Sequence, residues 1–230
     1  MCNPMSGVIT RERVLWDEWT DSHSEILKNH GLLDYSEMPD FVKFELVPPG
    51  GDYSLPFEKW RYQEDQEDVP EWYNRENAEA AARTVLPLWA ATHLITTEGA
   101  TVDLSGIKNP SIVVLSKKIT VIGQQGGEVR AYGSSTVQSS GQQGGEVRAY
   151  DASTVRSTGQ QGGLVRAYDA STVLSTGQQG GLVWAYGSST VQSSGQQGGE
   201  VWAYGSSTVQ SSGQQGGEVQ ACCGKVIIIN

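Results

Sequence analysis

The chain has 230 residues, with 26 Asp and Glu against 16 Lys and Arg, and three cysteines. A net charge of −10 argues against nucleic-acid binding, because phosphates select basic surfaces. An odd number of cysteines forms no disulfide framework, and no stretch is apolar and long enough to cross a bilayer. We therefore expect a protein of a reducing compartment, the cytoplasm, with no membrane contact.

The first 104 residues contain no repeat and predict an α+β domain. Apolar residues on either side of a charged turn predict a hairpin from residues 8–10 and 14–16. A short helix follows over 25–27, because residues 20–22 can cap its start and Gly31 can close its end. This domain is close to the smallest size that supports a core of its own.

The second half of this domain predicts two strands and a longer helix. Alternating side chains predict strands over 42–47 and 57–62. Asn74 is placed to cap a helix that begins with an alanine-rich run, and Pro87 is expected to kink or end it. The segment after Pro87 then leads into the repeat region.

Nearly all of the acidity belongs to residues 1–104. They hold eight Lys and Arg against twenty Asp and Glu, a net charge of −12, which leaves +2 for the rest of the chain. This charge either serves solubility alone or forms a contact patch for a basic protein partner, in the extreme case as a mimic of nucleic acid. We expect most of the tryptophans here to be core or groove residues: Trp16, Trp19, Trp60, Trp72 and Trp89.

An 18-residue unit, seen whole at 123–140, returns in register at positions 141, 159, 177, 195 and 213. A fixed period of this length without helix formers is typical of a β-solenoid. One step back gives 105–122, in which 111–115 takes the place of the later Val-Arg-Ala-Tyr strands. We therefore predict an all-β, two-sided parallel β-solenoid of seven coils over 105–230, with degenerate first and last coils.

Each coil predicts two short strands joined by two turns. Val129 and Ala131 of the first strand are expected to point inward, against Val137 and Ser139 of the second, because side chains alternate along a strand. These residues are small, so the solenoid should be thin and flattened. Much of its cohesion must then come from backbone hydrogen bonds between coils.

In-register stacking turns each outward position into a row of like residues. One predicted row is tyrosine, and the row beside it begins with arginine and ends with tryptophan. These rows either only hold the stack together or also form a binding face, because Tyr, Trp and Arg are enriched at interface hot spots. The candidate binding face consists of Tyr132, Tyr150, Tyr168, Tyr186, Tyr204, Arg130, Arg148, Arg166, Trp184 and Trp202.

The opposite face carries rows of Thr and Ser that start at Thr136 and Ser140. The segment AYGSSTVQSS at 131–140 resembles the tandem units of bacterial ice-nucleation proteins, and the Thr rows are similar to those of β-solenoid antifreeze proteins. The resemblance implies an ice- or water-organising face. The chain departs from a flat Thr-x-Thr array, because long or charged side chains separate the two rows: Gln138, Arg156, Leu174, Gln192 and Gln210.

No metal or cofactor site is predicted. The coil resembles the calcium-binding β-roll in length and paired glycines, but its wide turn carries Gln-Gln where that motif needs Asp. Asp151 and Asp169 interrupt the other turn and are expected to be solvated. His30 and His93 show no metal-ligand spacing with the cysteines.

One catalytic hypothesis concerns the N-terminus. Removal of Met1 would expose Cys2, whose own amine could serve as base, with Asp21 and His23 assisting. The alternative is an inert cysteine and a capping turn, which we favour because the glycine-rich oxyanion elements of such enzymes are missing.

The far end of the repeat carries the vicinal Cys222 and Cys223 and an apolar tail over 226–229. The tail is too short for a membrane anchor. As part of the last coil it either lies covered or offers a strand edge to another chain, which predicts a homodimer through the C-terminal coil.

The whole arrangement resembles a group of bacterial and bacteriophage proteins in which a short N-terminal domain precedes VRAYGSST-type repeats. The matching residues are the repeat itself, Met1-Cys2, and segments 7–9, 20–23 and 69–72. The resemblance implies a phage or prophage setting in a bacterial cytoplasm and no particular chemistry. We therefore predict a non-enzymatic protein-binding or inhibitor protein directed at a host or defence protein, with the solenoid as scaffold or second binding face. An ice-organising protein is the alternative.

Overall fold

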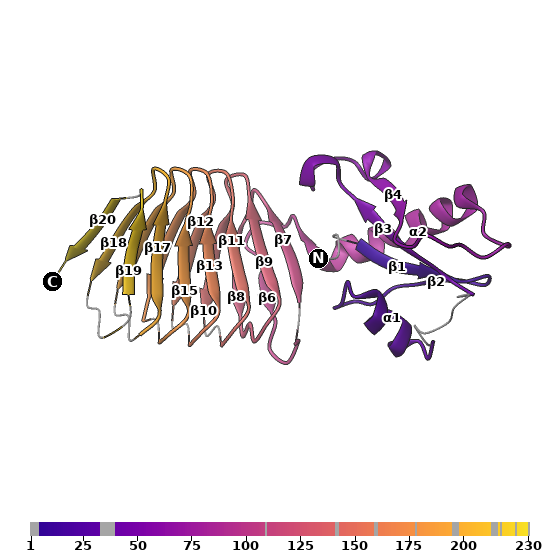
Figure 1. Cartoon of the computed structure of the whole chain (residues 1–230), viewed down its shortest axis with the longest axis horizontal. Helices are drawn as coiled ribbons and strands as arrows, with labels where there is room; N and C mark the ends of the chain where they lie inside the picture. Colours follow the sequence, from indigo (N-terminus) through magenta and orange to yellow (C-terminus); the bar gives the residue numbers. More distant parts are fainter. Residues whose placement is uncertain are drawn as a thin grey trace. The chain divides into compact units, whose positions relative to one another are not determined.

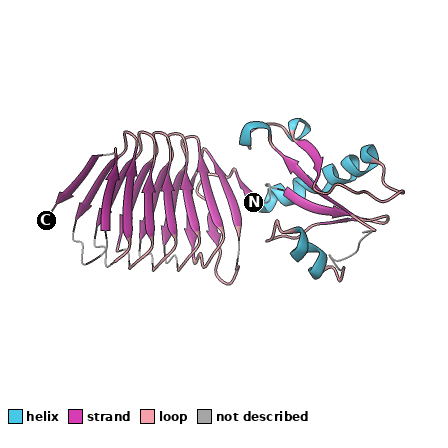
Figure 2. Cartoon of the chain, viewed as in Figure 1, coloured by secondary structure: helices cyan, strands magenta, loops and turns pink. Residues whose placement is uncertain are grey.

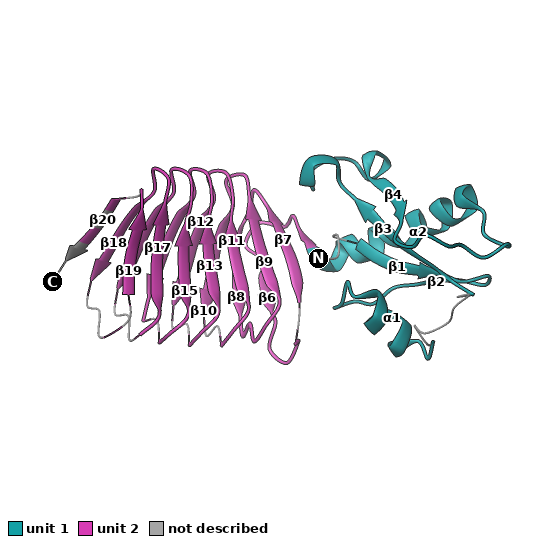
Figure 3. Cartoon of the chain, viewed as in Figure 1, with its two compact units in different colours: residues 1–93 teal, residues 94–230 magenta. Residues whose placement is uncertain are grey.

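The computed structural model describes residues 5–32, 40–108, 110–140, 143–158, 161–177, 179–194, 198–212, 216, 218–223 and 225–229. It divides the chain into two compact units, residues 1–93 and 94–230 (Figure 3). We expected this boundary after residue 104, and the structure places it between His93 and Leu94. With that boundary, the first unit has a net charge of −10 and the second is neutral.

Unit 1–93 is built on an antiparallel four-stranded sheet in the order β2-β1-β3-β4. Two α-helices and two short 3₁₀ segments complete the described part of this unit (Figure 2). Its elements are β1 (Met5–Ile9), β2 (Val14–Leu15), α1 (His23–Asn29), β3 (Val42–Val47), a 3₁₀ turn (Pro49–Gly51), a second one (Phe57–Lys59), β4 (Arg61–Glu64) and α2 (Arg75–His93).

Several predicted elements of this unit are confirmed. The hairpin is β1 with β2, and the predicted strand over 42–47 is β3. Helix α1 begins after Ser22, whose side chain accepts a hydrogen bond from the Glu25 backbone N–H, and Gly31 follows its end with a φ of +74°. A left-handed φ of this kind is what favours glycine after a helix.

One prediction for this unit was wrong in detail, and another is narrowed. Residues 57–62 were expected to form a strand, but Phe57–Lys59 is a 3₁₀ turn and the strand starts at Arg61. Pro87 was expected to kink or end its helix, and it does not end it, because α2 runs through it to His93. The helix persists because its buried face continues on both sides of the proline, with Leu86, Trp89 and Ala90 packed into the core.

The core of unit 1–93 is rich in large aromatic side chains. Trp60 is almost fully buried and makes edge-to-face contacts with Tyr53, Phe57 and Trp89, with ring centroids 5.7–6.0 Å apart. Its indole N–H donates to the Leu55 carbonyl at 3.2 Å. Such contacts bury large areas with a specific geometry, so this small unit relies on a few large residues.

Unit 94–230 is a β-solenoid of parallel strands arranged in two eight-stranded sheets (Figure 1). We call the first one the tyrosine sheet. Its strands in spatial order are β5 (Leu94–Ile95), β7 (Ser111–Leu115), β9 (Glu128–Tyr132), β11 (Glu146–Ala149), β13 (Leu164–Ala167), β15 (Leu182–Ala185), β17 (Glu200–Tyr204) and β19 (Glu218–Cys222).

We call the second sheet of the solenoid the threonine sheet. Its strands are β6 (Thr101–Asp103), β8 (Lys118–Ile122), β10 (Thr136–Ser140), β12 (Thr154–Thr158), β14 (Thr172–Thr176), β16 (Thr190–Ser194), β18 (Thr208–Ser212) and β20 (Lys225–Ile229). Each predicted coil contributes one strand to each sheet, which confirms the two-sided parallel solenoid.

The interior of the solenoid has the predicted composition. Val129, Ala131 and Val137 are fully buried and Ser139 nearly so, and their counterparts are buried in the following coils up to β18, whereas Val219 and Ala221 of the last coil are not. The structure adds a second buried serine row in the turn between the two strands of a coil, beginning with Ser135. The core is therefore thin and partly polar.

The solenoid begins earlier than the repeat suggested. Strands β5 and β6 pair with β7 and β8, so one further strand pair precedes residue 105. The step between them is 19 residues (Leu94 beside Val113), whereas the next step in the tyrosine sheet is 17 (Ser111 beside Glu128). Because of these offsets, an 18-residue period in the sequence does not reveal the first strands. They also shift strand 111–115 by one residue from the alignment that the period predicted, so that Ile112 and not Ser111 lies beside Val129.

Candidate binding surfaces

The predicted tyrosine row exists and is a continuous stack. The rings of Tyr132, Tyr150, Tyr168, Tyr186 and Tyr204 lie 4.7–5.1 Å apart from centroid to centroid, with interplanar angles of 5–8°. Each ring therefore covers the face of the next, and the surface presents ring edges and hydroxyls. Burial raises the pKa of Tyr168 and of Tyr186 above the ordinary value. A flat ligand cannot stack on the three inner rings without displacing a neighbouring tyrosine.

The predicted arginine row is engaged in ion pairs with glutamates of the same sheet. Arg130 contacts Glu128, and Arg148 bridges Glu128 at 2.7 Å and Glu146 at 2.8 Å. Arg166 continues the series to Glu146 at 2.6 Å. We call these five residues the ion-pair ladder.

The ladder is sheltered, because its side chains are only 16–22% exposed. The hydrogen bonds to Glu146 raise the pKa of Arg148, so this guanidinium remains charged. Arginines paired in this way have few donors left for an external phosphate or carboxylate.

The tryptophan end of the same row differs from coil to coil. Arg166 places its guanidinium 4.8 Å from the centre of the Trp184 ring, within cation–π range. Trp202 donates its indole N–H to Glu200 at 3.0 Å. The structure thus brings all ten predicted residues of the candidate face together on one surface, but it shows most of them in contact with one another.

The threonine sheet shows the predicted Thr and Ser rows in register. Thr136 lies beside Thr154 and Ser140 beside Thr158, with the Gln138–Arg156 pair between them. Arg156 lines a shallow hollow of about 250 Å³ together with Gln138 and the neighbouring hydroxyls. The middle row of long side chains therefore interrupts the surface, as the sequence indicated.

The two aspartates of the repeat fill a backbone role. Asp151 and Asp169 occupy a turn position at which other coils have glycine, and both have a φ of +55°. The Asp151 carboxylate accepts from the Gly133 N–H at 2.8 Å, and the Asp169 carboxylate accepts from the Asp151 N–H at 3.3 Å. Each aspartate thus ties its turn to the preceding coil, a contact that the sequence analysis did not foresee.

A cleft in unit 1–93 was missed by the sequence analysis. It measures about 300 Å³ and lies between the β1–β2 turn and the start of α2. Ile9 and Ala78 form an apolar floor, and Arg11, Arg13 and Trp72 lie on the rim. Its two walls are some sixty residues apart along the chain, so no local pattern reveals it, although a groove position was expected for tryptophans such as Trp72.

The rim of this cleft is partly closed by its own contacts. The Trp72 indole N–H donates to Asp40 at 2.6 Å, and Arg11 contacts the same carboxylate at 3.3 Å. The Arg11 guanidinium also lies 5.9 Å from the centre of the Trp72 ring.

The densest acidic segment of the chain has five carboxylates within residues 64–71, from the last residue of β4 into the loop that follows it. We call this segment the 64–71 loop. The side chain of Gln66 anchors it, because its amide oxygen accepts from the Lys43 N–H at 2.8 Å and its amide nitrogen donates to the Phe41 carbonyl at 3.2 Å. Glu67 and Asp68 are exposed just before Val69, itself 44% exposed, and Glu71 is exposed after it. The loop therefore presents negative charge from a fixed backbone.

A polar network closes the other end of this loop. Tyr62 hydrogen-bonds Tyr73 at 3.1 Å, Tyr73 donates to Glu64 at 2.7 Å, and Arg75 contacts the second Glu64 oxygen. Burial and these hydrogen bonds raise the pKa of Tyr73. Burial opposes ionisation of Glu64, but the Tyr73 and Arg75 contacts prevail and lower the pKa of that carboxyl. The network fixes the loop at its base.

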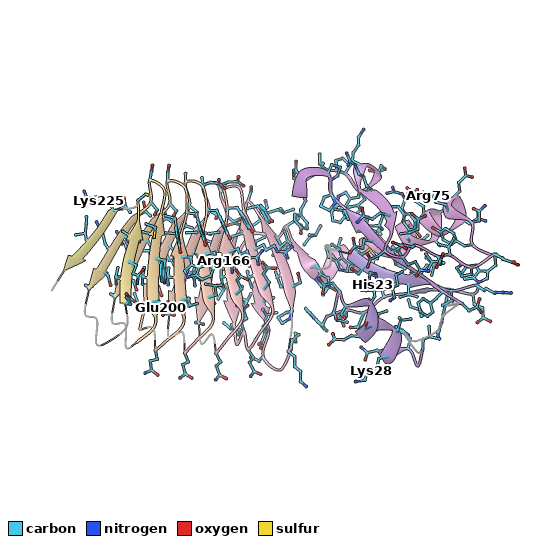
Figure 4. The ribbon with its side chains drawn as sticks, viewed as in Figure 1. His23, Lys28, Arg75, Arg166, Glu200 and Lys225 are labelled. Atoms are coloured by element: carbon cyan, nitrogen blue, oxygen red, sulfur yellow. The ribbon has the colours of Figure 1, made fainter. Side chains whose placement is uncertain are left out.

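Of the candidate catalytic residues, the structure describes Asp21 and His23. Cys2 lies outside the described residues. His23 is buried, with Nε2 3.0 Å from the Phe44 carbonyl and Nδ1 3.1 Å from an Asp65 oxygen (labelled in Figure 4). Both ring nitrogens are therefore engaged in tying α1 to the sheet.

The comparisons and searches add no assignment. Comparisons with protein-family models, with curated proteins and with solved structures found no match. Within the described residues, no group of three or more His, Cys, Asp or Glu side chains could hold a metal ion. None of the described helices is both long and apolar enough to span a membrane. Cys222 and Cys223 are free and exposed.

Proposed function

We propose that this chain is a non-enzymatic binding protein in which unit 1–93 recognises a basic surface of a protein partner. The observation that carries the proposal is the uneven distribution of charge: unit 1–93 has a net charge of −10 and the solenoid is neutral. Within the acidic unit, the 64–71 loop offers exposed carboxylates on an anchored backbone. A prearranged charged surface loses little entropy on binding and speeds encounter with an opposite charge.

The solenoid serves as scaffold in this proposal. Its tyrosine rings stack on one another and the arginines of the tyrosine sheet pair with glutamates, so the tyrosines and these arginines have an internal role that accounts for them. The resemblance to bacteriophage proteins supports a more concrete form of the proposal, a phage-encoded inhibitor of a host or defence protein in the bacterial cytoplasm.

The test compares two variants of the full chain in affinity capture from the native host. The loop variant combines Glu67→Gln, Asp68→Asn and Glu71→Gln. The control combines Glu12→Gln, Glu18→Gln and Glu58→Gln, which removes the same charge from exposed positions elsewhere on the unit. We expect a protein that the parent chain and the control capture and that the loop variant loses.

Two outcomes would contradict the proposal. Retention of the captured protein by the loop variant would move recognition away from the 64–71 loop. Equal loss with both variants would show that only the total charge matters, because long-range steering follows net charge and not the position of individual groups.

An ice- or water-organising role is the alternative, supported by the in-register Thr and Ser rows of the threonine sheet. Arg156 and Leu174 interrupt that surface with a charged and an apolar side chain, so we favour protein binding. A freezing assay on the full chain distinguishes the two: the alternative requires an effect on ice growth or nucleation, and we expect none.

A further inference from the structure

The tyrosine sheet departs from its own repeat at one place. Leu164 and Leu182 stand at the position that is glutamate in the other repeat coils, and Trp184 and Trp202 stand where the preceding coils have arginine. We call these four residues the leucine–tryptophan patch. All four are half-buried outward residues, whereas the inward Val and Ala of the same strands do not change. The packing of the core therefore does not require the departures.

The departures impose a cost on the isolated solenoid. In the coil with Glu200, the Trp202 indole N–H has a carboxylate acceptor at 3.0 Å. In the coil with Leu182, the indole nitrogen of Trp184 is covered and has no hydrogen-bond partner among the described residues. An unpaired buried donor costs about 1–3 kcal/mol. A glutamate at position 182, as in neighbouring coils, would remove this cost.

We propose that the leucine–tryptophan patch is the centre of a two-fold contact between two copies of this chain, tyrosine sheet against tyrosine sheet. Tryptophan is among the residues most enriched at interface hot spots, and an apolar centre within a charged rim is the usual anatomy of an interface. In a two-fold contact the same patch faces itself, so one apolar patch supplies both partners.

The charges on either side of the patch determine the direction of this contact. The ion-pair ladder before it has three arginines and two glutamates, a net charge of +1. Glu200 and Glu218 after it have the uncharged Trp202 and Gln220 as neighbours where the ladder has arginine, which gives −2. Figure 4 labels Arg166 and Glu200 within this sheet.

An antiparallel arrangement centred on Leu182 and Trp184 places Arg166 of each copy near Glu200 of the other. A parallel arrangement places like charges together, which is unfavourable. The antiparallel contact is therefore the one that the charges favour.

The area available predicts a weak association. Strands of five residues are about 16 Å long and coils lie ~4.8 Å apart, so five coils offer roughly 400 Å² per copy. Stable complexes bury about 1,200 Å² or more in total. We therefore expect a dimer that forms only at high protein concentration.

The first test is Leu182→Glu in the full chain, measured by sedimentation velocity over a wide range of protein concentration. The new carboxylates face each other across the two-fold axis, so we expect self-association to weaken about tenfold or more. The melting temperature should stay equal or rise, because Trp184 gains an acceptor. The matched control is Leu174→Glu on the threonine sheet, in the row that already contains Arg156, and it should leave self-association unchanged.

The second test uses charge reversal. Arg166→Glu and Glu200→Arg each bring like charges together in an antiparallel dimer, so each variant alone should be monomeric. An equal mixture of the two should recover a dimer, because both cross-contacts are then attractive. Circular dichroism of each variant confirms that the solenoid is folded.

Four results would overturn the proposal. The first three are a parent chain that stays monomeric at all concentrations, an effect of Leu174→Glu equal to that of Leu182→Glu, and a charge-reversal mixture that stays monomeric. The fourth is a self-association that Leu182→Glu leaves unchanged, as expected for a contact through the C-terminal coil.

Discussion

The two units of this chain achieve stability in opposite ways. Unit 94–230 repeats small interior residues and stacks its outward side chains in rows from coil to coil, so most contacts join neighbouring coils and the net charge is zero. Unit 1–93 has no repeat, a core of large aromatic residues, and an excess of ten negative charges. In a repeated surface, stacking in register places each outward side chain next to a like or complementary side chain of the neighbouring coil. A non-repeating surface has no such rule and leaves polar and charged groups exposed. Specific recognition is therefore expected in the non-repeating unit.

The largest expected loss of stability comes from a substitution in the aromatic core of unit 1–93. Trp60→Ala removes three edge-to-face contacts and an indole hydrogen bond, and it should destabilise unit 1–93 by about 3–5 kcal/mol. Denaturant unfolding monitored by tryptophan fluorescence measures the loss. Trp60→Phe, which keeps a ring at the same place, should cost clearly less. A loss under about 1 kcal/mol for Trp60→Ala would contradict the described core.

The next largest loss of stability tests whether stacked tyrosines of neighbouring coils stabilise the solenoid. Tyr168→Leu removes stacking on two neighbours, and Tyr132→Leu removes stacking on one. At about 0.5–1.5 kcal/mol per aromatic pair, the central substitution should cost about 1–3 kcal/mol, roughly twice the cost at the end. Thermal unfolding followed by far-ultraviolet circular dichroism gives both values. Equal losses would show that the rings act independently of their stacked neighbours.

Sequence periodicity predicted most of the solenoid because a repeat applies the same physical rule in every coil. Alternation at Val129 and Ala131 determined the inward face, and stacking in register then required the tyrosine row. The first strand pair escaped because Leu94 lies 19 residues before its partner Val113, which breaks the period. Pro87 does not end α2 because burial of the helix face on both sides of it outweighs the loss of one backbone hydrogen bond.

The candidate site was predicted less completely. The sequence indicated which residues share the tyrosine sheet, but not that Arg148 would be held between two glutamates. That contact depends on the side-chain conformations of residues in neighbouring coils, which the repeat spacing of the sequence does not determine. The cleft at Trp72 and the anchoring of the acidic loop by Gln66 depend on tertiary contacts between segments that are distant in the sequence. No local sequence pattern predicts such contacts.

A smaller effect, on the alkaline titration of tyrosine, tests whether the tyrosine row is partly buried or fully exposed. Burial raises the folded-state pKa of Tyr168 and Tyr186 above their ordinary value of about 10. A raised folded pKa gives stability that is complete below pH ~10 and is lost as the pH rises through the folded value. We expect phenolate absorbance of the folded chain to appear later in an alkaline titration than that of the unfolded chain. Coincident titration curves would contradict burial of the row.

The smallest expected effect concerns the turn aspartates. Asp169→Gly removes an exposed hydrogen bond to the Asp151 N–H but relieves a left-handed backbone, so the two changes should cancel to within about 0.5 kcal/mol. Asp169→Val keeps the strain and loses the bond, and it should cost at least about 1 kcal/mol. Denaturant midpoints of the two variants test this order, and a reversed order would contradict it.

The most direct test of the central claim is hydrogen exchange of the full chain, with and without the protein that it captures from its host. The account predicts new protection in unit 1–93, strongest over the 64–71 loop and its neighbours in β4, with unchanged exchange in the strands of both solenoid sheets. Protection confined to the tyrosine or threonine sheet, with the 64–71 loop unaffected, would contradict the assignment of recognition to the acidic unit.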